Sequence, residues 1–240
     1  MKKIIYTLVI LIITFHANAQ TYINTSPVSG TWTLAGSPYI VTVAAFINGG
    51  TSLTIDPGVD VKFMPNTVFY IQGSLVASGT SAFPITFEAN DTTGWHDDII
   101  SNGGWHGINF QPYQGSSDNS ILKNCIIKDY KHGVNGNMNG YAALYIYRGL
   151  HVDSCDISHC QSIYNGAEGE IVLFQGGGAV EMEHTRIHDC RTRVATLRIG
   201  TGTGVSNYVH DSRIDHNEGL VCAIWIITSH CHRTSIVNIM

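Results

Sequence analysis

Acidic and histidine side chains recur at one position of a segment that repeats through the second half of the chain. Each lies two residues after an isoleucine: Asp129, His159, Asp189, His216 and Asn238. If the segments form stacked strands, equivalent positions of neighbouring strands lie about 4.8 Å apart. Two interpretations follow: a corner ladder of polar side chains that hydrogen-bond to one another, which we favour, or a stripe that binds a metal ion or a sugar. Asp129, His159, Asp189 and His216 are therefore the first binding candidates.

The spacing of the other histidines does not predict a metal site, although the chain has 12 of them. His184 and His188 are four residues apart, the spacing at which two histidines share a zinc ion on a helix. On a strand this spacing places them about 13 Å apart, too far for one ion. His230 and His232 would lie about 7 Å apart on a strand and would need a third ligand. We therefore predict no metal site.

Aromatic residues are numerous in the central third of the chain and could contact sugar rings. Tyr145 and Tyr147 flank Ile146, so on a strand the two tyrosines share one face and the isoleucine takes the other. One of these faces must belong to the core. Tyr145 and Tyr147 are the second pair of binding candidates.

All six cysteines fall in the second half of the chain: Cys125, Cys155, Cys160, Cys190, Cys222 and Cys231. Cys125 and Cys155 occupy the same repeat position, and so do Cys160 and Cys190, which makes each pair neighbours across adjacent units. Cys160 and Cys190 fall near a corner and are the better disulfide candidates. Cys125 and Cys155 could pair as well, or stack inward as small apolar thiols.

The elements that position these side chains are short strands in a repeat. Isoleucines 127, 157, 187, 214 and 236 anchor five similar segments, 22 to 30 residues apart. In each segment small or apolar residues alternate with polar ones, which is typical of strands, and glycine-containing stretches separate them. A unit this small cannot bury its own apolar face, so we predict a solenoid of stacked coils.

Composition agrees with a β-rich solenoid. Charged residues make up 13% of the 240-residue chain, hydrophobic residues 44%, and there are 25 glycines. These values argue against disorder and against a coiled coil. With 13 Lys and Arg and a formal net charge of −5, the chain is not expected to bind nucleic acid.

Residues 1–19 have the pattern of a secretory signal peptide. Lys2 and Lys3 precede an apolar run from Ile4 to Phe15, and Ala17-Asn18-Ala19 matches a cleavage signal before Gln20. The run is too short for a membrane span, and no later segment is long and apolar enough for one. We expect a protein that is secreted or exposed at the cell surface, without a membrane span.

Three stretches of the first half carry a family resemblance. LTIDPGVDVKF (53–63), GSLVASGTSAFPITFEAN (73–90) and WHGINF (105–110) resemble the opening coils of right-handed parallel β-helix proteins of the secreted or surface-exposed bacterial type. The resemblance implies an all-β, right-handed parallel β-helix with little or no helix apart from the signal peptide. It covers residues 38–240, and residues 20–37 would form an N-terminal lead-in or cap. Because the last unit begins at Arg233 and stops at Met240, we expect an incomplete helix in a fragment or a prematurely ended chain.

The same fold includes polysaccharide-cleaving enzymes, so the resemblance also suggests catalytic candidates. Asp97, Asp98 and His106 invite comparison with polygalacturonase-type glycosidases, although no suitable basic motif follows them. A pectate-lyase-like enzyme would instead need calcium held by acidic residues and a basic residue nearby. The corresponding set would be Asp153, Asp156, Glu181 and Glu183, with Arg186.

The sequence as a whole favours a non-enzymatic protein with a structural, adhesive or carbohydrate-contacting role, whose partner is a polysaccharide or cell-surface glycan. The alternative is a polysaccharide lyase or glycoside hydrolase acting in a lateral groove of the β-helix. No cofactor is expected, except calcium under the lyase alternative. The oligomeric state is not predicted.

Overall fold

The computed structural model describes residues 20–97, 103–112, 120–132, 142–163, 169–176, 178–200, 207–219, 222–226, 230–231 and 235–236. The predicted signal peptide, residues 1–19, and the candidate Asp98 lie outside the described residues. Within the described part there is one short helical element, the 3-10 turn η1 (Leu34–Gly36), and no helix long and apolar enough to cross a membrane.

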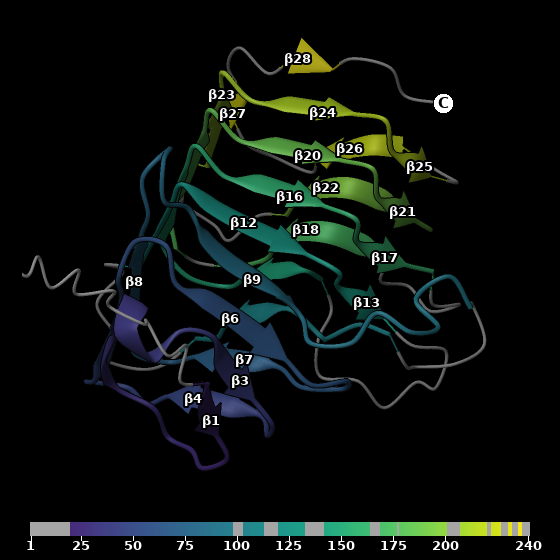
Figure 1. The fold of residues 1–240 in the computed structure, drawn as a ribbon. Coiled ribbons are helices and arrows are strands. Elements are labelled where there is room, and N and C mark those ends of the chain that lie inside the picture. The colour runs from purple at the N-terminus through teal and green to yellow at the C-terminus, as the bar shows by residue number, and fades with distance from the viewer. Residues whose placement is uncertain are drawn as a thin grey trace, which may run out of the picture.

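The described chain winds through the same sheets in each coil, and the coils stack along one axis (Figure 1). Sheet A consists of β1 (Thr21–Ile23), β3 (Tyr39–Val41), β6 (Asp60–Phe63), β9 (Ile85–Ala89), β12 (Cys125–Lys128), β16 (Asp156–Ser158), β20 (Arg186–His188), β24 (Arg213–Asp215) and β28 (Ser235–Ile236). Sheet B consists of β2 (Gly30–Trp32), β5 (Ser52–Ile55), β8 (Ser74–Ser78), β11 (Ser120–Lys123), β15 (Leu150–Asp153), β19 (Val180–Glu183), β23 (Tyr208–His210) and β27 (His230–Cys231).

Two further sheets complete each turn of the coil. Sheet C consists of β4 (Ala45–Ile47), β7 (Phe69–Ile71), β10 (Ile108–Phe110), β14 (Leu144–Ile146), β18 (Glu170–Phe174), β22 (Ala195–Ile199) and β26 (Cys222–Ile226). A short sheet between A and C consists of β13 (Lys131–His132), β17 (Gln161–Ser162), β21 (Arg191–Thr192) and β25 (Glu218–Gly219). Neighbouring strands pair in parallel in all four sheets, so the prediction of an all-β parallel β-helix is confirmed.

The anchoring isoleucines form one column inside sheet A. Ile127 pairs in register with Ile157, Ile157 with Ile187, Ile187 with Ile214, and Ile214 with Ile236. Ile127, Ile157, Ile187 and Ile214 are fully buried or nearly so. Because a slip by one residue would turn every isoleucine toward solvent, this column fixes the register of the coils.

Residues 20–37, the predicted lead-in, contribute strands to the same sheets. β1 pairs with β3 in sheet A, and β2 pairs with β5 in sheet B. Trp32 of β2 is 5% exposed and its ring stacks on Tyr39 with centroids 4.7 Å apart. This segment therefore covers the first end of the core as an extra, partial coil.

Two columns of left-handed residues mark the two ends of each strand in the later part of sheet A. Asn124, Ser154, His184 and Asp211 precede the strands with φ between 46° and 55°, and Asp129, His159, Asp189 and His216 follow them with φ between 50° and 60°. Asn, Asp and His tolerate this backbone conformation better than most residues. The Asp/His column found in the sequence is thus a corner of the coil, and its residue types serve the turn.

Four of the cysteines, Cys125, Cys155, Cys160 and Cys190, are buried free thiols in the structure. Burial and a neighbouring thiol raise the pKa of Cys125 beside Cys155, and that of Cys160 beside Cys190. The structure thus places the thiols of each predicted pair side by side within the core. That these pairs form disulfides stays a prediction.

Candidate glycan-binding site

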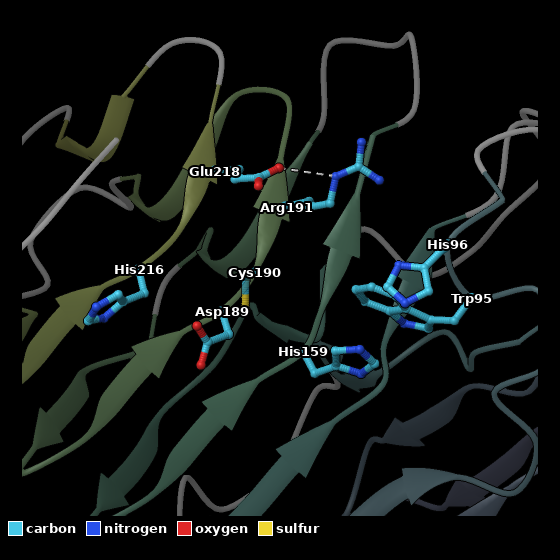
Figure 2. Close-up of a pocket in the computed structure, with 8 residues that line it drawn as sticks. All are labelled: Trp95, His96, His159, Asp189, Cys190, Arg191, His216 and Glu218. Atoms are coloured by element: carbon cyan, nitrogen blue, oxygen red, sulfur yellow. Dashed lines mark ion pairs between the residues drawn. The ribbon is translucent and has the colours of Figure 1, made fainter.

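A hollow of about 470 Å³ opens at the corner that follows the strands of sheet A, where the chain passes into the short sheet. It is lined by Trp95, His96, His159, Asp189, Cys190, Arg191, His216 and Glu218 (Figure 2). His159, Asp189 and His216 come from the predicted Asp/His column and follow one another from strand to strand (Figure 2). The volume lies in the range of small-molecule sites, about 300–1,000 Å³.

A buried lysine fixes the loop that brings Trp95 and His96 to the hollow. Lys131 of β13 is 1% exposed, and its Nζ donates to the carbonyl oxygens of Gly94 at 2.7 Å and Asp97 at 2.8 Å. Hydrogen bonds from a charged group contribute more than neutral ones, about 1.5–3 kcal/mol each. The loop after β9 is therefore held against the coils by the ammonium group and not only by its own turns.

Three rings form one wall of the hollow. The imidazole of His159 stacks on the indole of Trp95 with centroids 3.7 Å apart and planes 16° apart, and His96 meets the same indole edge-on at 5.0 Å. Asp129, whose side chain is 9% exposed, contacts His159 through Oδ1 and Nδ1 at 2.6 Å. Trp95 is buried, whereas the His159 side chain is 42% exposed. The indole thus supports an imidazole that lines the hollow and stays partly exposed.

Charged groups form the opposite rim. Arg191 of β21 and Glu218 of β25 are paired in register, and their side chains form an ion pair at 3.4 Å (Figure 2). Asp189, whose side chain is 62% exposed, contacts the neighbouring His188 at 2.6 Å. Charged groups of both signs therefore line the hollow together with the His159 ring.

A buried carboxylate holds the corner around His216. The side chain of Asp215 is fully buried and accepts hydrogen bonds from Arg186 at 2.9 and 2.8 Å. It also forms ion pairs with Arg213 and His216, each at 2.8 Å. The Arg186 guanidinium holds the pKa of Asp215 well below its usual range, with His216 and Arg213 acting in the same direction. Of the predicted Asp/His ladder, the part of the chain that the structure describes contains one contact between coils, that of Asp129 with His159. Asp189 and His216 instead contact residues adjacent to them in the chain.

The suggested catalytic residues do not meet in the hollow. Asp97 is exposed on the anchored loop, and Asp98 lies outside the described residues. His106 is 2% exposed; burial first, and then His132, lower its pKa to about 4. Its Nε2 has no hydrogen-bond partner among the described residues. An imidazole in this position is part of the interior.

The tyrosine candidates lie on sheet C rather than at the hollow. Ile146 of β14 is buried, Tyr145 is half-buried and Tyr147 is 38% exposed, so the core face is the isoleucine face. The Tyr145 hydroxyl donates to Gln175 Oε1 at 3.0 Å. The structure therefore divides the predicted binding residues between two surfaces.

The acidic residues considered for calcium binding lie in two different sheets, on either side of a corner of the coil. Asp153 ends β15, and Glu181 and Glu183 belong to β19, all in sheet B. Asp156 and Arg186 begin β16 and β20 in sheet A, where Arg186 is occupied by Asp215. Arg186, the basic residue considered with this set, is thus bound to Asp215 rather than to Asp153, Glu181 or Glu183.

Comparison of the chain with models of protein families, with curated proteins and with solved structures gives no match in any of the three.

Proposed function

We propose that this protein is a secreted or cell-surface β-helix protein that binds a polysaccharide or cell-surface glycan at the hollow beside Trp95, in an adhesive or structural role and without catalysis. The observation that carries the proposal is the half-exposed His159 ring, which stacks on Trp95 in a hollow that Arg191 and Glu218 also line. A pyranose ring needs such a combination, because it has apolar C–H faces and a rim of hydroxyl groups.

The balance of charges favours a glycan without strong charge. Arg191 is neutralised by Glu218, and Asp189 lies next to histidines. A highly anionic polymer would instead call for unpaired basic residues. Export, which the signal-peptide pattern of residues 1–19 predicts, would bring this hollow into contact with extracellular polysaccharides.

A polysaccharide and glycan array probed with the purified protein tests the proposal. Arg191→Ala should weaken binding of the best glycan about tenfold, the loss expected for about 1.4 kcal/mol of contact. Lys62→Ala is the matched control, since Lys62 forms a half-buried ion pair with Glu88 elsewhere on sheet A. Equal binding by the two variants would contradict the assignment of the hollow.

The same samples test the enzymatic alternative. The non-enzymatic proposal predicts bound glycan with no new reducing ends and no unsaturated ends after prolonged incubation. Release of either product, abolished by substitution of Asp189 or Glu218, would replace the binding function with a hydrolase or a lyase.

A further inference from the structure

A second cluster of side chains lies where the strands of sheet B end. It consists of histidines and carboxylates from successive coils. Asp153, Glu183 and His210 are neighbours in register at the ends of β15, β19 and β23. His184 follows Glu183 directly at the first corner, with φ of 48°. The cluster is separate from the hollow, because it lies at the opposite end of the sheet A strands.

Two of the three separations between potential ligand atoms in this cluster match those of a metal site. His184 Nδ1 lies 3.3 Å from Asp153 Oδ1 and 3.5 Å from Glu183 Oε2, and all three atoms lie within 4.8 Å of one another. With zinc bonds of about 2.0–2.2 Å, the ligand atoms of a tetrahedral site stand roughly 3.3–3.6 Å apart. These contacts are long for charge-assisted hydrogen bonds, which are about 2.7–2.9 Å.

Neighbouring groups hold the two carboxylates by their other oxygens. His151 Nε2 contacts Glu183 Oε1 at 2.9 Å, and Lys123 Nζ contacts Asp153 Oδ2 at 2.6 Å. Glu183 Oε2 and Asp153 Oδ1 are thus turned toward His184, although Ser154 also donates to Asp153 Oδ1 at 2.7 Å. In metal sites, hydrogen bonds to the oxygen that does not bind the metal orient a ligand carboxylate in this way.

We propose that Asp153, Glu183 and His184 bind one Zn²⁺ ion, which links two successive coils and keeps a fourth position open. The imidazole ligand favours a transition metal over calcium, which prefers oxygen ligands only. His210 Nε2 lies 3.8 Å from Glu183 Oε2, and Asp211 contacts its Nδ1 at 3.1 Å. A further imidazole, which Asp211 contacts, thus lies beside one of the three proposed ligands, with Glu181 Oε1 also 3.7 Å from its Nε2. The proposal does not depend on glycan binding.

Calorimetric titration of the purified, metal-stripped protein with ZnCl₂ at near-neutral pH tests the site. We expect one zinc per chain, with CaCl₂ in excess failing to displace it. His184→Ala should abolish this binding, and His151→Ala should weaken it about 10- to 100-fold, the usual effect of losing a group behind a ligand. His216→Ala is the matched control, since it removes a half-exposed histidine at the other corner and should leave zinc binding unchanged.

Cobalt supplies a second readout that does not rely on affinity. The visible absorption of bound Co²⁺ should show tetrahedral coordination in the wild type and should disappear in Asp153→Asn, whose circular dichroism should match the wild type. Absence of zinc binding by the folded wild-type protein would overturn the proposal. So would full retention of zinc by the folded His184→Ala variant.

Discussion

Acidification should destabilise this protein through His106 at a pH well above that at which its carboxylates become protonated. His106 is 2% exposed, and burial, with a contribution from His132, lowers its pKa from 6.5 to about 4. The unfolded chain takes up a proton as the pH falls below about 6.5, whereas folded His106 stays neutral until about 4. Protons therefore favour unfolding between these two values, and stability is lost as the pH falls through that window.

The size of the loss follows from the size of the shift. One pKa unit corresponds to 1.36 kcal/mol, so a shift from 6.5 to about 4 amounts to roughly 3 kcal/mol. This is a large part of the 5–15 kcal/mol that separates typical native and unfolded states. Glu88, whose pKa is lowered by Lys128 and Lys62 against the effect of burial, loses its stabilising contribution only as the pH falls below its usual value near 4. The two effects occupy different pH ranges.

Urea unfolding followed by circular dichroism at several pH values from 7 to 4.5 measures the effect. Between pH 7 and 4.5 the wild type should lose roughly 2 kcal/mol more than His106→Leu, most of the full effect, because all other titrating groups are common to both proteins. The reasoning is refuted if the free energies of unfolding of the two proteins fall in parallel.

Three other substitutions or treatments test the packing that positions the hollow. Lys131→Met should lower the free energy of unfolding by about 2 kcal/mol and change the fluorescence emission of Trp95, because two loop carbonyls lose a charged donor. Unchanged emission would show that the loop keeps its conformation without Lys131. Ile157→Ala should lower the free energy of unfolding by about 2–5 kcal/mol in urea titrations, as expected for a fully buried side chain, and a loss below 1 kcal/mol would contradict the stacked column. Intact mass before and after reduction should reveal a Cys160–Cys190 disulfide in protein that has passed through an oxidising compartment; an unchanged mass would leave both as thiols.

The coil architecture could be predicted because it repeats. The isoleucines at equivalent positions identified the register of sheet A, which the pairing of Ile127 with Ile157 and of Ile157 with Ile187 confirms. The column of Asp and His residues could also be recognised in the sequence, but the structural reason for these residue types could not. The positive φ of Asp129 and His159 shows that the turn itself requires such residue types.

The two candidate sites could be predicted only in part, because each combines residues from different coils with local detail. Trp95 reaches His159 through a loop that Lys131 anchors, and nothing in the spacing of these residues signals that contact. The search for histidine pairs along one strand considered His184 only with His188 and likewise missed its contact with Asp153 of the preceding coil. Contacts between coils depend on the register and on the lengths of the intervening loops.

Titration calorimetry of the best glycan from the array against the wild type and His159→Ala tests the central claim most directly. Because His159 has φ of 50° and contacts Asp129, His159→Asn is measured beside it, since Asn tolerates this backbone conformation; in the folded variants the loss of the ring should weaken glycan binding about tenfold or more. Undiminished binding by the folded His159→Ala variant would contradict the claim that the hollow beside Trp95 binds the sugar.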